Sequence, residues 1–115
     1  MSSQSEIFDL IERLINELEE IEEDTTQGLN AVRILLNLFP ENAMLIQAFA
    51  FFNSAIFFVE TTKAQARSTA RNLSISNLSL QRVQEIGQEL ATTLGRTLEL
   101  KMQARNLRSR IEKLL

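Results

Sequence analysis

Large apolar residues recur at alternating spacings of four and three through the first 39 residues of the chain. Such a repeat is typical of a helix that buries a narrow seam against neighbouring helices, as in a coiled coil. Thr25 and Gly28 occupy two positions of the same register, so the repeat continues through residues 24–28. We expect one long helix over about residues 5–39, with a break near 24–28, and hence four helices, as the alternative. The apolar seam residues are Ile7, Ile11, Leu14, Leu18, Ile21, Val32, Leu35 and Phe39.

Two further helices are predicted after the single proline, Pro40. Proline suits the first turn of a helix, so the second helix is expected over about residues 40–73, antiparallel to the first because the connection is short. Ser79 is a good N-cap for a third helix over about residues 79–114. The sequence therefore predicts an all-α fold in a single domain, residues 1–115. Its architecture is an antiparallel up-down-up bundle of three long helices with coiled-coil-like packing.

The second predicted helix is apolar on more than one face in its first half. Five of the seven phenylalanines fall between Phe49 and Phe58. A helix at the surface of a monomeric bundle keeps one face in water, so this pattern indicates cover on a second face. We favour a homo-oligomer, with a membrane, an apolar ligand or another protein as alternatives. The predicted oligomer or partner interface comprises Phe49, Phe51, Phe52, Ile56, Phe57, Phe58, Gln47 and Asn53.

A membrane is the weaker interpretation of this segment. Its uncharged stretch, residues 42–59, is 18 residues long, whereas a spanning helix needs about 20 mostly apolar residues. No basic cluster flanks it, only Glu41 and Glu60. Gln47 and Asn53 either pair across a symmetric interface and fix its register, or lie at an edge of the helix that is exposed to solvent.

Small residues recur on one line of the third predicted helix, at Gly87, Ala91 and Gly95. An interior glycine costs a helix about 0.5–1 kcal/mol relative to alanine, so close helix packing is the expected reason for this ladder. Ala66 and Ala70 belong to a matching ladder on the second helix. We therefore expect helices 2 and 3 to pack closely along these residues.

Charge is distributed unevenly along the chain. The first 60 residues carry eleven acids and two bases, whereas the rest of the chain carries four acids and ten bases. Such halves attract each other, within one chain or between two. The acidic run over residues 17–24 is expected to be a solvated face, partly paired with Lys63, Arg67 or Arg96, and not a metal site.

A basic stripe lies on the third predicted helix, where Lys101, Arg105 and Arg108 follow the spacing i, i+4, i+7. If helices 1 and 3 run parallel with level starts, the stripe lies beside residues 26–38, which lack acids. We therefore expect the stripe to face solvent or an acidic partner. Nucleic acid is disfavoured because the chain is acidic, with a pI near 5.0, and no aromatic residue lies among these bases.

Catalysis is not expected. The sequence lacks His, Cys, Tyr and Trp, which removes the usual nucleophile–base pairs, and its three glycines form no phosphate-binding loop. We expect no cofactor, no metal and no small-molecule substrate. The first residues do not resemble a signal peptide, so a cytoplasmic location is expected. The favoured function is a non-enzymatic oligomeric scaffold or adaptor that mediates protein–protein interaction. The alternatives are a membrane-associated or apolar-ligand-binding protein, and a nucleic-acid accessory protein that uses the basic C-terminal helix.

Overall fold

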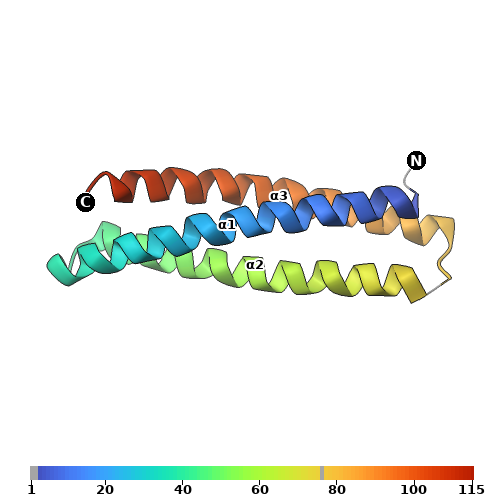
Figure 1. The fold of residues 1–115 in the computed structure, drawn as a ribbon, viewed down its shortest axis with the longest axis horizontal. Coiled ribbons are helices and arrows are strands. Elements are labelled where there is room, and N and C mark those ends of the chain that lie inside the picture. Colours follow the sequence, from blue (N-terminus) through green and yellow to red (C-terminus); the bar gives the residue numbers. More distant parts are fainter. Residues whose placement is uncertain (1–2, 76) are drawn as a thin grey trace.

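The computed structural model describes residues 3–75 and 77–115, which form three long helices and no strand. α1 spans Gln4–Leu38, α2 spans Ala43–Ile75 and α3 spans Leu80–Glu112. α1 and α3 run in one direction and α2 runs back in the other (Figure 1). The resulting rod measures 57 × 20 × 18 Å. The predicted all-α class and the three-helix up-down-up order are confirmed.

α1 is continuous through residues 24–28, so the alternative of four helices is wrong. Thr25 and Gly28 are buried there, as their register positions predict. The helix begins after Ser3, whose hydroxyl accepts a hydrogen bond from the backbone N–H of Glu6 at 3.2 Å. The uninterrupted seam keeps the backbone helical across this polar stretch, because a break would expose buried positions on both sides.

The start of α2 differs from its prediction. Pro40 lies in the turn, and the helix begins three residues later, at Ala43. The side-chain oxygen of Asn42 accepts a hydrogen bond from the backbone N–H of Leu45 at 3.1 Å. Asn42 therefore supplies the N-terminal cap, a role for which Asn is among the preferred residues.

The connection between α2 and α3 is short, residues 76–79, and its first residue, Ser76, lies outside the described residues. α2 extends to Ile75, two residues beyond its predicted end. The predicted cap of α3 is confirmed, since the Ser79 hydroxyl accepts a hydrogen bond from the N–H of Arg82 at 3.1 Å.

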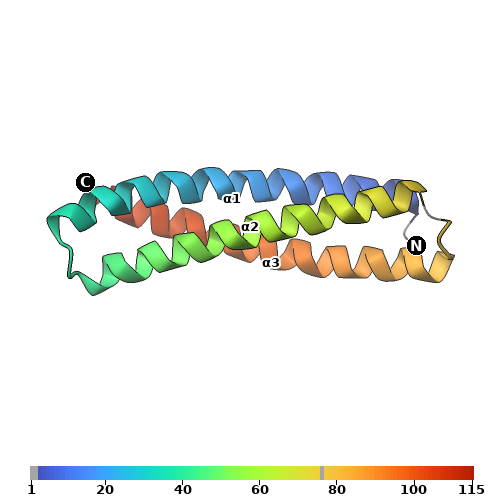
Figure 2. The same ribbon diagram turned by 90° about the horizontal axis from the view of Figure 1, so that it is seen from below.

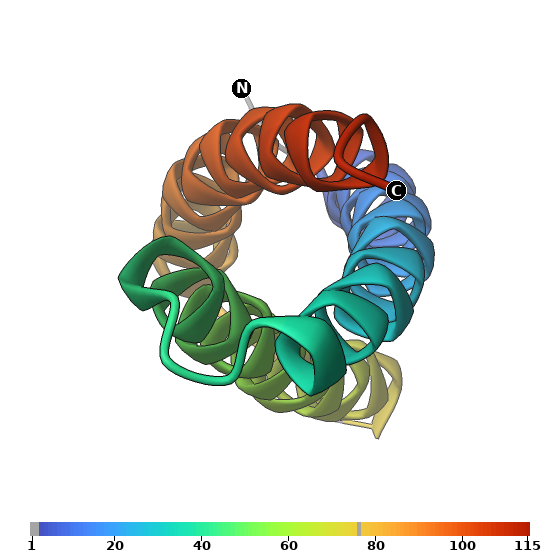
Figure 3. The same ribbon diagram turned by 90° about the vertical axis from the view of Figure 1, so that its left-hand side faces the viewer.

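α1 is the central helix of the bundle. It packs along both α2 and α3, whereas α2 and α3 approach each other at few points. α2 crosses the bundle obliquely (Figure 2), and the three helices wind around a common axis when viewed along the rod (Figure 3). The buried residues form two clusters. One includes Ile7, Leu14, Leu18, Val59, Ala66 and Leu94, and the other includes Leu29, Val32, Leu45, Phe52 and Ile111.

α1 and α2 come together closely at Gly28. A Cβ atom placed on Gly28 would lie 2.4 Å from the Cζ atom of Phe52, whose ring is fully buried. The ring therefore occupies the space that a side chain at position 28 would need. This close approach, rather than backbone flexibility, explains a glycine in the middle of a long helix.

Thr25 provides a test of polar burial in the core. Its side chain is fully buried, and its Oγ1 atom has no hydrogen-bond partner in the described chain. An unsatisfied buried hydroxyl costs about 1–3 kcal/mol. Thr25→Val keeps the shape and removes the hydroxyl, so we expect the free energy of unfolding to rise by about 1 kcal/mol in urea denaturation.

Thr97 is the matched control for this substitution. It is as deeply buried as Thr25, but its hydroxyl donates a hydrogen bond to the backbone oxygen of Thr93 at 2.8 Å. Thr97→Val should lower the free energy of unfolding by about 0.5–1.5 kcal/mol. Equal effects of the two substitutions would contradict the assignment of the Thr25 hydroxyl as unpaired.

Candidate functional site

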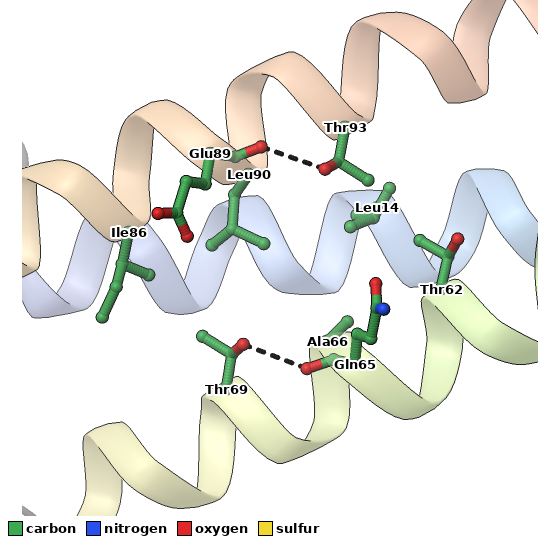
Figure 4. A pocket seen from close by; sticks show the side chains of 9 residues that line it. All are labelled: Leu14, Thr62, Gln65, Ala66, Thr69, Ile86, Glu89, Leu90 and Thr93. Carbon is green, nitrogen blue, oxygen red and sulfur yellow. Dashed lines mark hydrogen bonds between the residues drawn. The ribbon is translucent and has the colours of Figure 1, made fainter.

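α2 and α3 leave an open seam between them. Three hollows occupy it, with volumes of about 200, 220 and 260 Å³. In the middle hollow, side chains of α2 and α3 face each other across the gap, and Leu14 of α1 lies at its base (Figure 4). The middle hollow shares Thr69, Ile86 and Glu89 with one neighbour. We call these three hollows together the α2–α3 groove.

The two walls of the groove carry matched rows of residues. Each row places one residue at every seventh position, which returns to the same helix face after two turns. Because the helices are antiparallel, the rows meet in four pairs, and the members of each pair line the same hollow. These four rungs, from the end of the groove nearest the α1–α2 turn, are Phe51 with Gln103, Phe58 with Arg96, Gln65 with Glu89, and Asn72 with Arg82.

The polarity of the groove changes along its length. Phe51, Phe58 and Leu100 line the hollow nearest the α1–α2 turn. In the middle hollow, the side chains of Gln65 and Glu89 point into the gap (Figure 4). The two phenylalanines are thus confined to one end of the groove, where Arg96, Glu99 and Gln103 lie beside them, whereas the other two hollows are lined by aliphatic and polar side chains together.

Two of the three threonine hydroxyls that line the middle hollow are paired within their own helices. Thr69 donates a hydrogen bond to the backbone oxygen of Gln65, and Thr93 donates one to the backbone oxygen of Glu89, each at 3.0 Å (Figure 4). The carboxylate of Glu89 lies 3.7 Å from the guanidinium of Arg82. Gln65 and Glu89 are both exposed although they line this hollow, so the hollow is open to solvent.

The predicted interface residues of α2 divide between different sides of the helix. Phe52 belongs to the core over Gly28, which corrects its placement at an interface. Phe49 and Ile56 pack against the same core cluster, and the guanidinium carbon of Arg33 lies 5.9 Å from the centre of the Phe49 ring. α1 thus covers much of the face that the apolar run was expected to offer to a second subunit.

The remaining members of that set are partly or fully exposed. Phe51 and Phe58 line the groove, whereas Phe57 points outward with 70% of its surface exposed. Gln47 and Asn53 are exposed, and the Asn53 amide donates a hydrogen bond to the backbone oxygen of Phe49 at 3.0 Å. Neither polar residue is enclosed within the chain.

The small-residue ladder of α3 does not pack against α2. Gly87 is buried, but Ala91 and Gly95 are exposed, and nothing lies within 4 Å of a Cβ placed on Gly95. Ala66 is buried in the core and Ala70 packs against it. The predicted close packing of these residues is wrong because α2 and α3 both pack on α1 and stay apart along the groove.

The basic stripe of α3 is paired within the chain, which corrects its predicted position beside residues without acids. Its role as a surface for an acidic partner stays a prediction. α3 is displaced along α1, and this displacement brings the stripe beside the acidic run instead of residues 26–38. The pairs are Lys101 with Glu17 and, at 3.6 Å, with Glu20, Arg105 with Glu20 and Asp24 at 2.9 Å each, and Arg108 with Asp24 at 2.7 Å.

Asp24 is the buried member of this network. Its side chain is 7% exposed, whereas Arg105 is 48% and Arg108 is 30% exposed. The hydrogen bond to Asp24 raises the pKa of Arg105 above its ordinary value, and desolvation opposes this only in part. Arg105 therefore stays charged at neutral and moderately alkaline pH. The network holds α3 on α1 by charge-assisted hydrogen bonds.

The other predicted partners of the acidic run have different outcomes. Lys63 is confirmed, since its ammonium lies 3.8 Å from Glu19 and 3.9 Å from Glu22. Arg67 and Arg96 form no ion pair within residues 3–75 and 77–115. In those same ranges, no group of three or more acidic side chains is placed to hold a metal ion.

One helix among the described residues, α2, is long and apolar enough to span a membrane. An 18-residue window of it has a mean hydropathy of 1.6, and 28% of that window is buried in the bundle. This is weak evidence for a membrane, since length and composition alone decide it.

The chain matches no protein-family model, and comparison with curated proteins and with solved structures finds no similar protein.

Proposed function

We propose that the protein is a non-enzymatic, cytoplasmic helical scaffold that forms a homo-oligomer with coiled-coil-like packing and mediates protein–protein interaction. The observation that supports this proposal most is the apolar surface left on α2. Phe57 is 70% and Ile46 is 48% exposed, and Phe51 and Phe58 line an open groove. Apolar surface of this kind marks an interaction site more often than a free face.

The experiment that tests the proposal is the absolute mass in solution, measured by light scattering after size exclusion without detergent. We expect a discrete species of at least twice the 13.1 kDa chain mass. The physical reason is that association removes the apolar surface of α2 from water. A stable monomer at all accessible concentrations would contradict self-association.

The same surface supports a second candidate, a protein that binds a membrane or an apolar ligand through α2. Flotation with neutral phospholipid vesicles separates the two candidates. A scaffold is expected to stay in the aqueous fraction at every lipid concentration, whereas a membrane-associated protein floats. The nucleic-acid alternative loses its support because the three bases of the stripe are engaged by acids of α1.

A further inference from the structure

We propose that the α2–α3 groove is the dimerisation surface of the protein. A second copy docks groove to groove, with its two-fold axis parallel to the rod, so that α2 of each copy lies antiparallel to α3 of the other. This inference rests on the proposed self-association and adds its surface and its arrangement. The four groove helices of the pair then form one core, flanked by an α1 on either side.

The repeat of the groove walls supports a helical occupant. Residues at every seventh position line up along a helix, and such rows accept a straight antiparallel helix in four-helix bundles. A second copy supplies two such helices with the same spacing as the first. Both copies therefore complete each other's groove through one symmetric contact.

The polarity of the groove decides the direction of the second copy. We call the dimer whose two-fold axis is parallel to the rod the parallel arrangement. It brings each rung beside the same rung of the partner. Phe51, Phe58 and Leu100 of both copies then gather at one end of the core. An axis across the rod, the crossed arrangement, would set both rings against amides, Phe58 against the partner's Gln65 and Phe51 against the partner's Asn72. The parallel arrangement has one such contact fewer, since only Phe51 meets an amide, that of the partner's Gln103.

The charges of the groove agree with the parallel arrangement. The α3 row carries charge at three of its four positions, Arg82, Glu89 and Arg96, whereas the α2 row carries none. Because α3 faces the partner's α2, no like charges meet. Gln65 lies level with the partner's Glu89, where its amide can donate to the carboxylate.

Other contacts across the interface also distinguish the two directions. In the parallel arrangement Arg96 lies level with the partner's Phe58, a favourable place for a cation over a ring. The crossed arrangement would offer ion pairs between Glu89 and the partner's Arg96. Glu89 and Arg96 are exposed, and exposed pairs contribute only about 0.2–1 kcal/mol each, so they do not outweigh the additional ring–amide contact of that direction.

Two neighbouring phenylalanines provide the first test. Phe58→Glu places a carboxylate in the groove and is expected to weaken the dimer at least 100-fold, whereas Phe57→Glu, on the outer face of α2, should leave it unchanged. The measurement is mass against concentration by light scattering, with helicity checked by circular dichroism. Equal or greater weakening by Phe57→Glu would overturn the groove as the surface and leave self-association intact.

A second variant keeps the test decisive if Phe58→Glu fails to fold. Gln65 is exposed, so Gln65→Glu should preserve the fold. It sets a carboxylate against the partner's Glu89 and is expected to raise the dissociation constant about tenfold or more. An unchanged dissociation constant would overturn the groove assignment.

The arrangement itself is tested by cross-linking, because the chain has no cysteine. A mixture of Gln65→Cys and Glu89→Cys chains should form an oxidised heterodimer under the parallel arrangement, whereas a mixture of Glu89→Cys and Arg96→Cys should not. The reverse result, or no cross-link in either mixture, would overturn the arrangement. A wild-type chain that is monomeric would overturn this inference together with the proposed self-association.

Discussion

Asp24→Asn is expected to lower the free energy of unfolding by about 2–3 kcal/mol, because charge-assisted hydrogen bonds contribute about 1.5–3 kcal/mol each. The Asp24 carboxylate is buried and accepts from the Arg105 Nε atom at 2.9 Å and from the Arg108 Nη1 atom at 2.7 Å. Asparagine keeps the volume but removes the charge. The arginines regain some water, so the loss stays below the 3–5 kcal/mol of a fully buried pair. Urea denaturation followed by circular dichroism measures it.

Glu20→Gln is the matched control for Asp24→Asn. Glu20 pairs with the same arginine, Arg105, at 2.9 Å and with Lys101 at 3.6 Å, but its side chain is 47% exposed. Exposed ion pairs contribute about 0.2–1 kcal/mol each, so the loss should be about 0.5–1.5 kcal/mol, less than that of Asp24→Asn. Losses of equal size in the two variants would contradict the view that burial of Asp24 sets the strength of the network.

The arginine side of this network has a defined dependence on pH. A group whose pKa is raised by folding stabilises the fold fully below its unfolded pKa and loses that contribution as the pH rises through its folded pKa. The pKa of Arg105 is raised. Its contribution is therefore complete at neutral pH and is lost only under strongly alkaline conditions.

The helices were predictable because each carries its own local signals. The four–three repeat of α1, a single proline and a serine cap place all three helices within a few residues of their observed ends. The cap of α2 was missed because Pro40 and Asn42 both suit a helix start, and only the observed hydrogen bond to Asn42 distinguishes them.

The register between α1 and α3 could not be predicted from apolar residues alone. A pattern that repeats every seven residues is unchanged when one helix slides by one repeat. Level helix starts would place Lys101 beside residues 26–38, whereas it pairs with Glu17. Charge separates the two registers, since only the observed one brings the basic stripe to the acidic run. A charge match along the two helices would have found it.

The groove was missed for a related reason. The spacing of Phe51 and Phe58 continues to Gln65 and Asn72, but the polar members hide the row in a search for apolar residues. Apolar patterns report the core and not the rim of a groove. The sequence pattern therefore could not distinguish Phe51 and Phe58, which line the groove, from Phe52, which belongs to the core.

Gly28→Ala is expected to lower the free energy of unfolding by about 1–3 kcal/mol, although alanine favours a helix over glycine. The added methyl would lie 2.4 Å from Cζ and 2.7 Å from Cε2 of Phe52. The Phe52 ring is fully buried, so it cannot move without displacing its core neighbours. The clash therefore outweighs the gain of about 1 kcal/mol in helix propensity. Thermal and urea denaturation measure the difference.

Gly95→Ala separates packing from propensity in the Gly28→Ala experiment. Gly95 is also inside a helix, but nothing lies within 4 Å of an added Cβ. It should gain about 0.5–1 kcal/mol, so the two glycine substitutions have opposite signs. Phe52→Leu in the Gly28→Ala background should cost less than in the native chain, because the smaller side chain relieves the clash. A stabilising Gly28→Ala would show that the ring can yield, and the close approach of α1 and α2 would then not depend on glycine.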